Sequence, residues 1–212
     1  ELCQFEAPFD VRFRDLMVST AESLMNCGFR VIYAYTQSDE ISLLFDPEEQ
    51  LFGRKFRKYD STLAGEASAR FSLQLGQAAS FDCRISQLPT PELVVTYFRW
   101  RNEDAARNAL SAWCYWTLRK AGLDKQKATT ELDGLSVSEK NELLFQHGIN
   151  FNDLPNWQKR GVGLYWEDYD KPSVNPITKE EVAAKRRRIC TDFDLPMKDE
   201  YGQFVRSLIP AA

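Results

Sequence analysis

The sequence predicts an α+β fold in which helices pack on an antiparallel sheet, and two observations lead to that class. Runs rich in β-branched and aromatic residues occur early, at 29–34 and 41–45, and again late, at 162–166 and 188–193. Between them, apolar residues recur at helical spacing over most of the chain. Strands at both ends of a chain, with helices massed between, are typical of an antiparallel sheet with an added helical layer.

The first predicted elements are a helix and a β-hairpin. A helix is expected over 10–27, where apolar residues repeat at helical spacing and Gly28 follows the last of them. A short polar link then joins the two early β-rich runs, which indicates a hairpin. Asp39 and Glu40 would lie at its turn or at the start of its second strand.

The rest of the chain is predicted to be mainly helical, with a second strand pair near its end. Ser136 and Glu139 match the capping box that starts a helix. The residues of 149–161 are rich in turn formers and precede the two late β-rich runs. The other expected elements are a helix at 48–75, a strand near Ile85, and helices at 92–97, 102–121, 124–132, 136–147 and 199–208.

The composition limits the classes of function. Hydrophobic residues make up 43% and charged residues 27% of the 212 residues, an ordinary globular balance. The net charge of −4 argues against a protein whose whole surface attracts nucleic acid electrostatically, but it is compatible with local basic patches. Five scattered cysteines are typical of reduced thiols in the cytoplasm, and a single histidine argues against a His-rich zinc site. No apolar run approaches the roughly 20 residues that span a bilayer.

Ser38-Asp39-Glu40 is the first candidate site. Neighbouring side chains of a regular strand point to opposite faces, so Asp39 and Glu40 share a site only where a turn relaxes that alternation. Two solvated acids on a turn are the simpler interpretation. However, the apolar runs on both sides place the turn at the end of central strands, where nucleotide-polymerising palm folds hold Mg²⁺ with carboxylates. A single carboxylate is too few, so a second must come from another strand.

The basic run Gly53–Lys58 is the second candidate site. On a helix, Arg54 and Lys58 would lie on one face at i and i+4, with Lys55 nearby. One interpretation is a solvated helical face. The other is a clamp on a triphosphate, in which Arg binds oxygens in a fork and Lys acts as a point charge.

The polar residues of Leu135–Asp153 form a third, weaker candidate. Lys140 fits an exposed helix position, and Asn150 and Asn152 fit a simple turn. None of the three indicates a site by itself.

The basic stretch Lys185–Arg188, which includes Arg186 and Arg187, is a fourth candidate. It fits a phosphate-binding patch, and it fits a charged loop or helix end equally well. In an acidic chain, binding of RNA would need a focused basic track of this kind.

Taken together and in order, these stretches resemble the tRNA-His guanylyltransferase family, whose members add nucleotides to the 5′ end of tRNA in the 3′-to-5′ direction. The resemblance covers nearly the whole chain, and the order and rough spacing of the motifs match as well as their letters. The motifs that carry it are YTQSDEISLLF, KYDSTLAGEASARFS, FDCR, SVSEKNELLFQHGINFND and KRGVGLYW.

The resemblance implies a polymerase palm-like core at residues 1–135, with a helical and hairpin C-terminal region at 136–212 packed on it. It also implies two Mg²⁺ ions held by carboxylates on adjacent strands, with Asp39 as a metal ligand and Glu40 as a neighbouring functional acid. The residues implied in contacts with nucleotide, triphosphate or tRNA are Ser38, Arg54, Lys55, Lys58, Lys140, Asn150 and Asn152.

The chain departs from the family pattern at three points. The family's other metal aspartate lies in a strand and turn of the type DGRGF, and we expect that motif upstream of Glu1. Ala106 replaces the histidine of the eukaryotic motif tied to selection of tRNA-His, and Ala7 replaces a lysine before the first helix. The chain is therefore more similar to the bacterial and archaeal guanylyltransferase-like branch, which repairs 5′-truncated tRNAs.

The activity that the resemblance implies is template-dependent 3′-5′ nucleotidyl transfer to tRNA, with GTP and ATP as substrates. It also implies a cytoplasmic homotetramer without a membrane partner. Two other classes stay open. A palm-like nucleotide cyclase would act on a nucleoside triphosphate alone, and a non-catalytic RNA-binding module would bind RNA without reaction.

Overall fold

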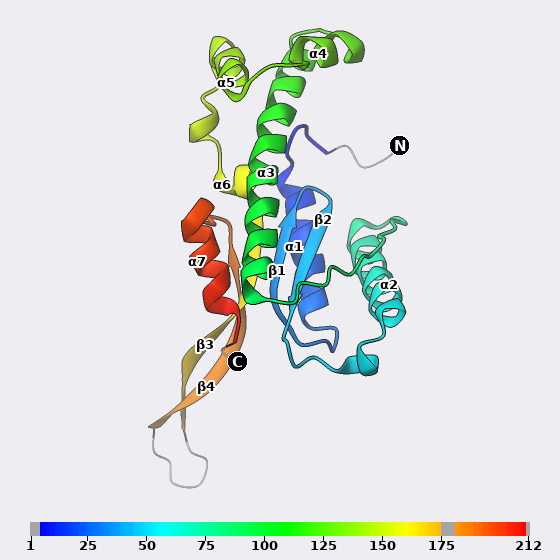
Figure 1. The fold of residues 1–212 in the computed structure, drawn as a ribbon, viewed down its shortest axis with the longest axis vertical. Coiled ribbons are helices and arrows are strands. Elements are labelled where there is room, and N and C mark those ends of the chain that lie inside the picture. The colour runs from blue at the N-terminus through cyan, green and yellow to red at the C-terminus, as the bar shows by residue number, and fades with distance from the viewer. Residues whose placement is uncertain (1–4, 175–180, 211–212) are drawn as a thin grey trace.

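The computed structural model describes residues 5–174 and 181–210, which form helices around one sheet (Figure 1). No helix in these ranges is both long and apolar enough to cross a membrane. The elements in chain order are α1 Val11–Met25, β1 Val31–Gln37, β2 Glu40–Phe45, the 3-10 helix η1 Leu51–Arg54, α2 Phe56–Leu75, α3 Pro91–Lys120, α4 Lys125–Leu132, α5 Val137–Gln146, the 3-10 helix η2 Phe151–Asp153, α6 Asn156–Arg160, β3 Val162–Val174, β4 Glu181–Asp192 and α7 Lys198–Leu208.

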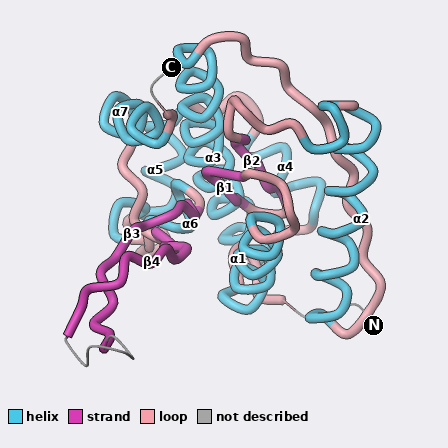
Figure 2. Tube along the Cα trace, turned by 90° about the horizontal axis from the view of Figure 1, so that it is seen from below, coloured by secondary structure: helices cyan, strands magenta, loops and turns pink. Residues whose placement is uncertain are grey.

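A four-stranded antiparallel sheet forms the centre of the molecule, with the strand order β2-β1-β3-β4. Helices cover both of its faces: α1 and α2 pack on one face, and α3 and α7 on the other (Figure 1 and Figure 2). The far end of α3 extends past the sheet and packs against α4 and α5. The predicted α+β class is therefore confirmed.

β1 is the most deeply buried strand because helices cover both of its faces. Tyr33 and Tyr35 belong to the core formed with α3 and α7, whereas Ala34 belongs to the core formed with α1 and α2. This division follows from the alternation of side chains along a strand. The strand therefore provides a rigid base for the turn at its end.

The structure confirms both predicted strand pairs. β1 and β2 pair from Val31↔Phe45 to Gln37↔Glu40, with an irregularity near Val31. β3 and β4 form a longer ribbon than the runs 162–166 and 188–193 predict, because the pairing continues past these runs as far as Val174↔Glu181. The capping box is also confirmed, since the side chains of Ser136 and Glu139 each accept a hydrogen bond from the other's backbone N–H.

The predicted break between helices at 92–97 and 102–121 is wrong, because both segments belong to α3. Val94, Phe98 and Asn102 are all buried, and their spacing continues one buried stripe through the expected break. The charged residues between them occupy the other side of the same helix.

The predicted strand near Ile85 is also wrong. Residues 77–89, all of them described, run beside α2 without regular secondary structure. The hydroxyl oxygen of Ser68 accepts a hydrogen bond from the backbone N–H of Phe81 at 2.8 Å, and that of Ser72 accepts one from Ala79 at 2.9 Å. Hydroxyl groups of α2 thus accept hydrogen bonds from backbone N–H groups that, in a strand, would have donated to a neighbouring strand.

Two buried tyrosines join the sheet to α7. The hydroxyl oxygens of Tyr33 and Tyr201 are 2.9 Å apart, and both residues are fully buried. Burial raises the pKa of both phenols well above the ordinary value of 10. A phenol whose pKa rises on folding stabilises the fold fully below the unfolded value, and this contribution is lost as the pH rises toward the folded value.

We therefore expect the free energy of unfolding to fall above about pH 10, by up to ~1.4 kcal/mol per pH unit for each of these phenols. Urea denaturation at a series of pH values measures the slope, and phenolate absorbance reports ionisation. The Tyr33→Phe variant should show a shallower decline, because one such phenol is removed. Ionisation of all eight tyrosines near pH 10 in the folded protein would contradict this expectation.

Candidate active site at the β1–β2 hairpin

The turn between β1 and β2 consists of Ser38 and Asp39. Ser38 has a φ of 52°, in the left-handed region that two-residue hairpin turns use. The hydroxyl of Thr36 donates to the carbonyl oxygen of Glu40 at 3.0 Å, and Nε2 of Gln37 donates to a backbone carbonyl of α6 at 3.1 Å. The turn is thus fastened on both sides, and Asp39 lies at its tip.

Asp39 and Glu40 have different surroundings, although they are adjacent in sequence. Glu40 forms an ion pair with Arg101 on α3. Asp39 is exposed, and no described residue donates a hydrogen bond to its carboxylate. In the described part of the chain, no three His, Cys, Asp or Glu side chains are grouped so that they could hold a metal ion. Asp39 is therefore the carboxylate of the hairpin that has no ion partner among the described residues, whereas Glu40 is already paired.

A hollow of about 1540 Å³ runs alongside β2. It is bounded by β2, the start of α2, the connection 81–91 and α3. Asp39 and Arg101 line it at one end of β2, and Arg54 lines it at the other. The outer edge of β2 has no strand neighbour in the described ranges, so its backbone donors and acceptors face this hollow.

A second pocket of about 260 Å³ adjoins the turn at Ser38. Its wall is mainly apolar and aromatic, with Phe9 and Phe13 from the start of the chain and Trp157 from α6. Asp10 beside it is not free, because hydrogen bonds from Arg12 and the backbone of Glu6 hold the pKa of its carboxyl well below its usual range. This pocket was not predicted from the sequence, although the recurrence of Phe5, Phe9 and Phe13 at intervals of four is a signal for it.

The prediction that Arg54 and Lys58 share one helical face is wrong. Phe52, Gly53 and Arg54 have φ values of 54°, 60° and 57°, so the chain makes a tight left-handed turn there. α2 begins only at Phe56. The turn directs Nη1 of Arg54 to a carbonyl of the preceding loop at 2.8 Å, which fixes this side chain in place.

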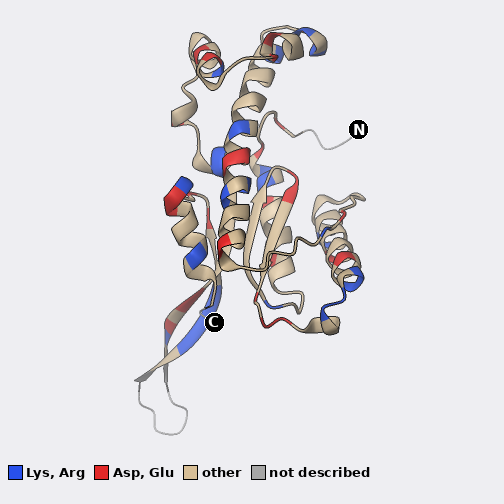
Figure 3. Cartoon of the chain, in the orientation of Figure 1, with Lys and Arg blue, Asp and Glu red and all other residues tan. Residues whose placement is uncertain are grey.

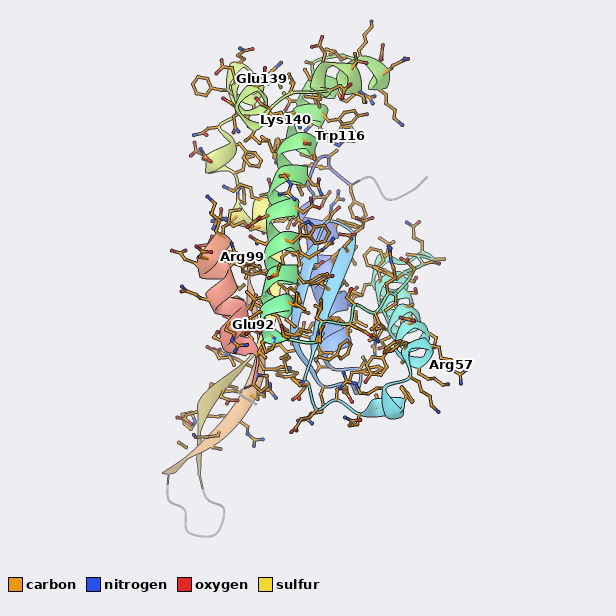
Figure 4. The ribbon with its side chains drawn as sticks, viewed as in Figure 1. Arg57, Glu92, Arg99, Trp116, Glu139 and Lys140 are labelled. Carbon is orange, nitrogen blue, oxygen red and sulfur yellow. The ribbon has the colours of Figure 1, made fainter. Side chains whose placement is uncertain are left out.

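Lys55, Arg57 and Lys58 are exposed around the N-terminus of α2, where Figure 4 labels Arg57. No side chain caps this helix, and its dipole and first N–H groups favour an anion there. This end of β2 is opposite to the turn (Figure 1). Five strand steps of ~3.3 Å separate the two ends by roughly 17 Å. The structure therefore does not bring the basic run to Asp39.

Glu49 organises the loop between β2 and α2. Its burial would raise the pKa of the carboxyl, but hydrogen bonds from the backbone N–H groups of Arg30 and Leu51 outweigh that effect and lower the pKa. The carboxylate thus stays charged and ties the loop to the start of β1. A charged anchor of this kind keeps the basic run near the end of the hollow.

Comparisons with known proteins identify the family to which this arrangement belongs. The family model described as tRNA-His guanylyltransferase matches residues 1–89, and that of the Thg1 C-terminal domain matches residues 92–194. A tRNA(His) guanylyltransferase of Debaryomyces hansenii is 31% identical over 199 residues, which cover 87% of this chain and 75% of that protein. The chain belongs to the tRNA-His guanylyltransferase family.

Further relatives and solved structures agree with this assignment. A probable tRNA(His) guanylyltransferase of Drosophila melanogaster is 34% identical over 170 residues, or 76% of this chain, and the chain spans 59% of its length. A bacterial tRNA(His) guanylyltransferase (Thg1)-like protein in complex with ATP has a TM-score of 0.73 at 26% identity, covering 98% of this chain and 83% of the other. A complex with GTP has a TM-score of 0.70 at 28% identity, covering 97% and 82%.

The family residues expected in α5 and η2 lie in the helical region at the far end of α3. Nζ of Lys140 donates to the hydroxyl of Ser111 on α3 at 3.1 Å, and Figure 4 shows Lys140 between these helices. Asn150 accepts a hydrogen bond from the backbone of Asn152 at 3.2 Å and donates to Asp153 at 2.8 Å. These side chains thus hold their own region together, and their contact with nucleotide or tRNA stays a prediction.

Arg186 and Arg187 lie on β4, in the ribbon that projects from the sheet. Figure 3 shows basic residues along β4 beside acidic residues along β3. Arg188 forms an ion pair with Glu167 at 2.7 Å, whereas the guanidinium of Arg187 lies 4.7 Å from the ring centroid of Trp166. The candidate residues therefore lie in four separate places: the β1–β2 turn, the start of α2, the region of α5 and η2, and β4.

Proposed function

We propose that this chain carries out template-dependent 3′-5′ nucleotidyl transfer, adding nucleotides, typically from GTP, to the 5′ end of tRNA and repairing 5′-truncated tRNAs. The observation that carries the proposal is the exposed Asp39 carboxylate on a fastened hairpin turn, beside a hollow of about 1540 Å³. Membership of the tRNA-His guanylyltransferase family supports the reaction class. The complexes of bacterial relatives with ATP and GTP support both nucleotides as substrates.

We propose that two Mg²⁺ ions serve the reaction and that Asp39 is one of their ligands. When bound, such ions activate the attacking hydroxyl and neutralise charge on the leaving pyrophosphate. The described residues do not complete a two-ion site, because Arg101 pairs with Glu40 and leaves Asp39 as the free carboxylate of the hairpin. Among the described strands, none pairs with the outer edge of β2, and the hollow beside this edge has room for a further strand. A further strand bearing the second aspartate would pair with this edge.

The two ends of the hollow would hold different parts of the substrates. The aromatic pocket beside Ser38 suits the face of a nucleobase, next to the proposed reaction centre. Lys55 and Lys58, with Arg54 fixed beside them, would bind phosphates at the far end of β2. Because that end lies roughly 17 Å from the turn, the phosphates bound there are distinct from the phosphate that reacts near Asp39.

The reaction forms one bond and breaks one. At a 5′-triphosphorylated tRNA end, the 3′ oxygen of the incoming nucleotide attacks the α-phosphorus, and the bond to pyrophosphate breaks. The hydroxyl proton passes to solvent. A 5′-monophosphate would first be joined to AMP from ATP with release of pyrophosphate, and AMP would then leave when the 3′ oxygen attacks. The protein contributes by holding the attacking oxygen, the phosphorus and the leaving group in line, and such positioning accounts for much of the rate acceleration in such transfers.

We expect Arg187→Ala to weaken tRNA binding about threefold to tenfold and to reduce the slope of log affinity against log salt by about 1, as loss of one phosphate contact does. The Trp166 indole N–H donates to the backbone of β1 at 2.8 Å, so the ring holds Arg187 in a fixed position for a phosphate. Filter binding over a series of salt concentrations measures both quantities.

Arg188→Ala is the matched control for Arg187, because the charge of Arg188 is already offset by Glu167. It should change the affinity less than Arg187→Ala does. Equal losses in the two variants would show that the ribbon contributes only diffuse charge. Arg186, which lies opposite Tyr169 on the ribbon, provides a third variant of the same strand.

The proposed function is tested by incubating the full-length protein with Mg²⁺, labelled GTP and a tRNA lacking its first nucleotide. Addition of label to the 5′ end supports the proposal. A cyclic nucleotide formed without RNA would instead indicate a palm-like cyclase, and tRNA binding without extension would indicate an RNA-binding module. Assembly as a homotetramer and location in the cytoplasm stay predictions, which native mass measurement and cell fractionation would test.

A further inference from the structure

The ion pair between Glu40 and Arg101 joins the candidate active site to the longest helix of the fold. Glu40 is the first residue of β2 and directly follows Asp39. Its Oε2 contacts Nη2 of Arg101, which lies 61 residues away on α3. This contact connects the tip of the hairpin to a helix that packs against β1 of the sheet and also against α5, α6 and α7.

Arg101 is itself held in place. Its side chain is 15% exposed, and its guanidinium lies 5.4 Å from the ring centroid of Trp100. Its Nε is buried and has no hydrogen-bond partner among the described residues. The next residue, Asn102, donates to the carbonyl of Arg160 at 2.9 Å and so fastens α3 to α6. A guanidinium that is largely removed from water and cannot lose its proton requires a carboxylate partner, and Glu40 supplies it.

The pair has a direct consequence for Asp39. Two neighbouring carboxylates at one turn repel each other and would compete for the same cation. Pairing with Arg101 offsets the charge of Glu40 and draws its side chain toward α3. Glu40 also lines the hollow, but its charge is offset, so Asp39 is the carboxylate there that has no ion partner among the described residues.

We propose that Arg101 is a positioning residue for nucleotidyl transfer: through Glu40 it fixes the β1–β2 turn, so that Asp39 presents its carboxylate to the reaction centre. Arg101 acts on Glu40, and this role needs no contact of Arg101 with the nucleotide or the tRNA. The inference rests on the proposed function and adds a residue that the sequence analysis did not single out.

The test measures the kinetics of labelled GTP addition to a tRNA lacking its first nucleotide, with the full-length protein. Arg101→Ala should lower kcat by about 100-fold, the scale of a misplaced reacting group. The KM for GTP should stay within about threefold, because substrate binding is not removed. Arg101→Lys should be about tenfold faster than Arg101→Ala, since lysine keeps the positive charge but lacks the planar, forked donors of a guanidinium.

A double-mutant cycle separates positioning through Glu40 from an independent effect. Glu40→Gln combined with Arg101→Ala should be no slower than the slower single variant, because both substitutions break the same contact. Arg99→Ala is the matched control on α3: Arg99, labelled in Figure 4, forms an ion pair with Asp199 at 3.0 Å on α7. It should leave kcat unchanged.

Several results would overturn the inference. These are a wild-type kcat in Arg101→Ala, rate losses of the two single variants that multiply in the double variant, or no rescue by lysine. Melting temperatures identify a variant that fails to fold, and in that case the cycle of Glu40→Gln with Arg101→Lys gives the same comparison. Failure of the proposed function gives a different result, because wild type and Asp39→Ala would then both add no nucleotide. That result would refute both the proposed nucleotidyl transfer and the positioning role of Arg101.

Discussion

Replacing Asp39 with alanine is expected to lower the rate of 5′ nucleotide addition by about 1000-fold or more, equivalent to about 4 kcal/mol of transition-state stabilisation. Asp39 is exposed at the hairpin tip and lines the hollow, so its loss removes a proposed metal ligand without opening the core. Single-turnover extension of a tRNA lacking its first nucleotide measures the rate. The melting temperature should stay close to that of wild type.

Two further variants make the result specific to a carboxylate at that position. Asp39→Asn keeps the size of the side chain but removes its charge, and it should be as inactive as Asp39→Ala. Asp133→Ala is the matched control, because Asp133 is an exposed residue at the end of α4 and does not line the hollow. It should leave the rate unchanged. Wild-type addition by Asp39→Ala would refute the proposed role of Asp39.

Replacing Gly161 with alanine is expected to lower the free energy of unfolding by about 3–5 kcal/mol, from backbone strain and steric overlap together. Gly161 links α6 to β3 with a φ of 75° and a ψ of −168°, a region that is essentially restricted to glycine. A Cβ there would lie 2.7 Å from the carbonyl oxygen of Thr36 and from the ring of Tyr35. Both groups belong to β1, whose two faces are packed, so neither can move away at low cost.

Thermal unfolding should show this loss as a decrease in Tm of roughly 6–15 °C for a chain of this size. Gly65→Ala is the matched control, because Gly65 lies inside α2 and no atom lies within 4 Å of a Cβ built there. It should stabilise the protein by about 0.5–1 kcal/mol, the usual gain for alanine over glycine in a helix. Equal melting temperatures in the two variants would contradict the explanation.

The features that can be predicted from the sequence are those that depend on neighbouring residues. The hairpin around Asp39 follows from two apolar runs and a short polar link. The capping box at Ser136 depends on residues three positions apart. The family resemblance rests on short motifs in order, and the comparisons confirm it.

The wrong predictions arise where local patterns are ambiguous. The run Gly53–Lys58 has the composition of a helix. However, Phe52, Gly53 and Arg54 have left-handed backbone conformations, so the run is not one continuous helix and α2 begins only at Phe56. The run near Ile85 is apolar enough for a strand, but hydroxyl groups of α2 take up backbone donors of that segment. In the second case, contacts with another element decide between conformations that the sequence permits equally.

The sequence by itself determines that Asp39 and Glu40 lie at a hairpin turn or at the start of its second strand, and which family the motifs resemble. Both depend on residues that are close along the chain. Only the tertiary structure decides that the two acids differ. Arg101 is 61 residues away, and it pairs with Glu40 because the packing of α3 on the sheet brings it to the hairpin. The same packing leaves Asp39 at the end of the hollow and the outer edge of β2 unpaired in the described ranges.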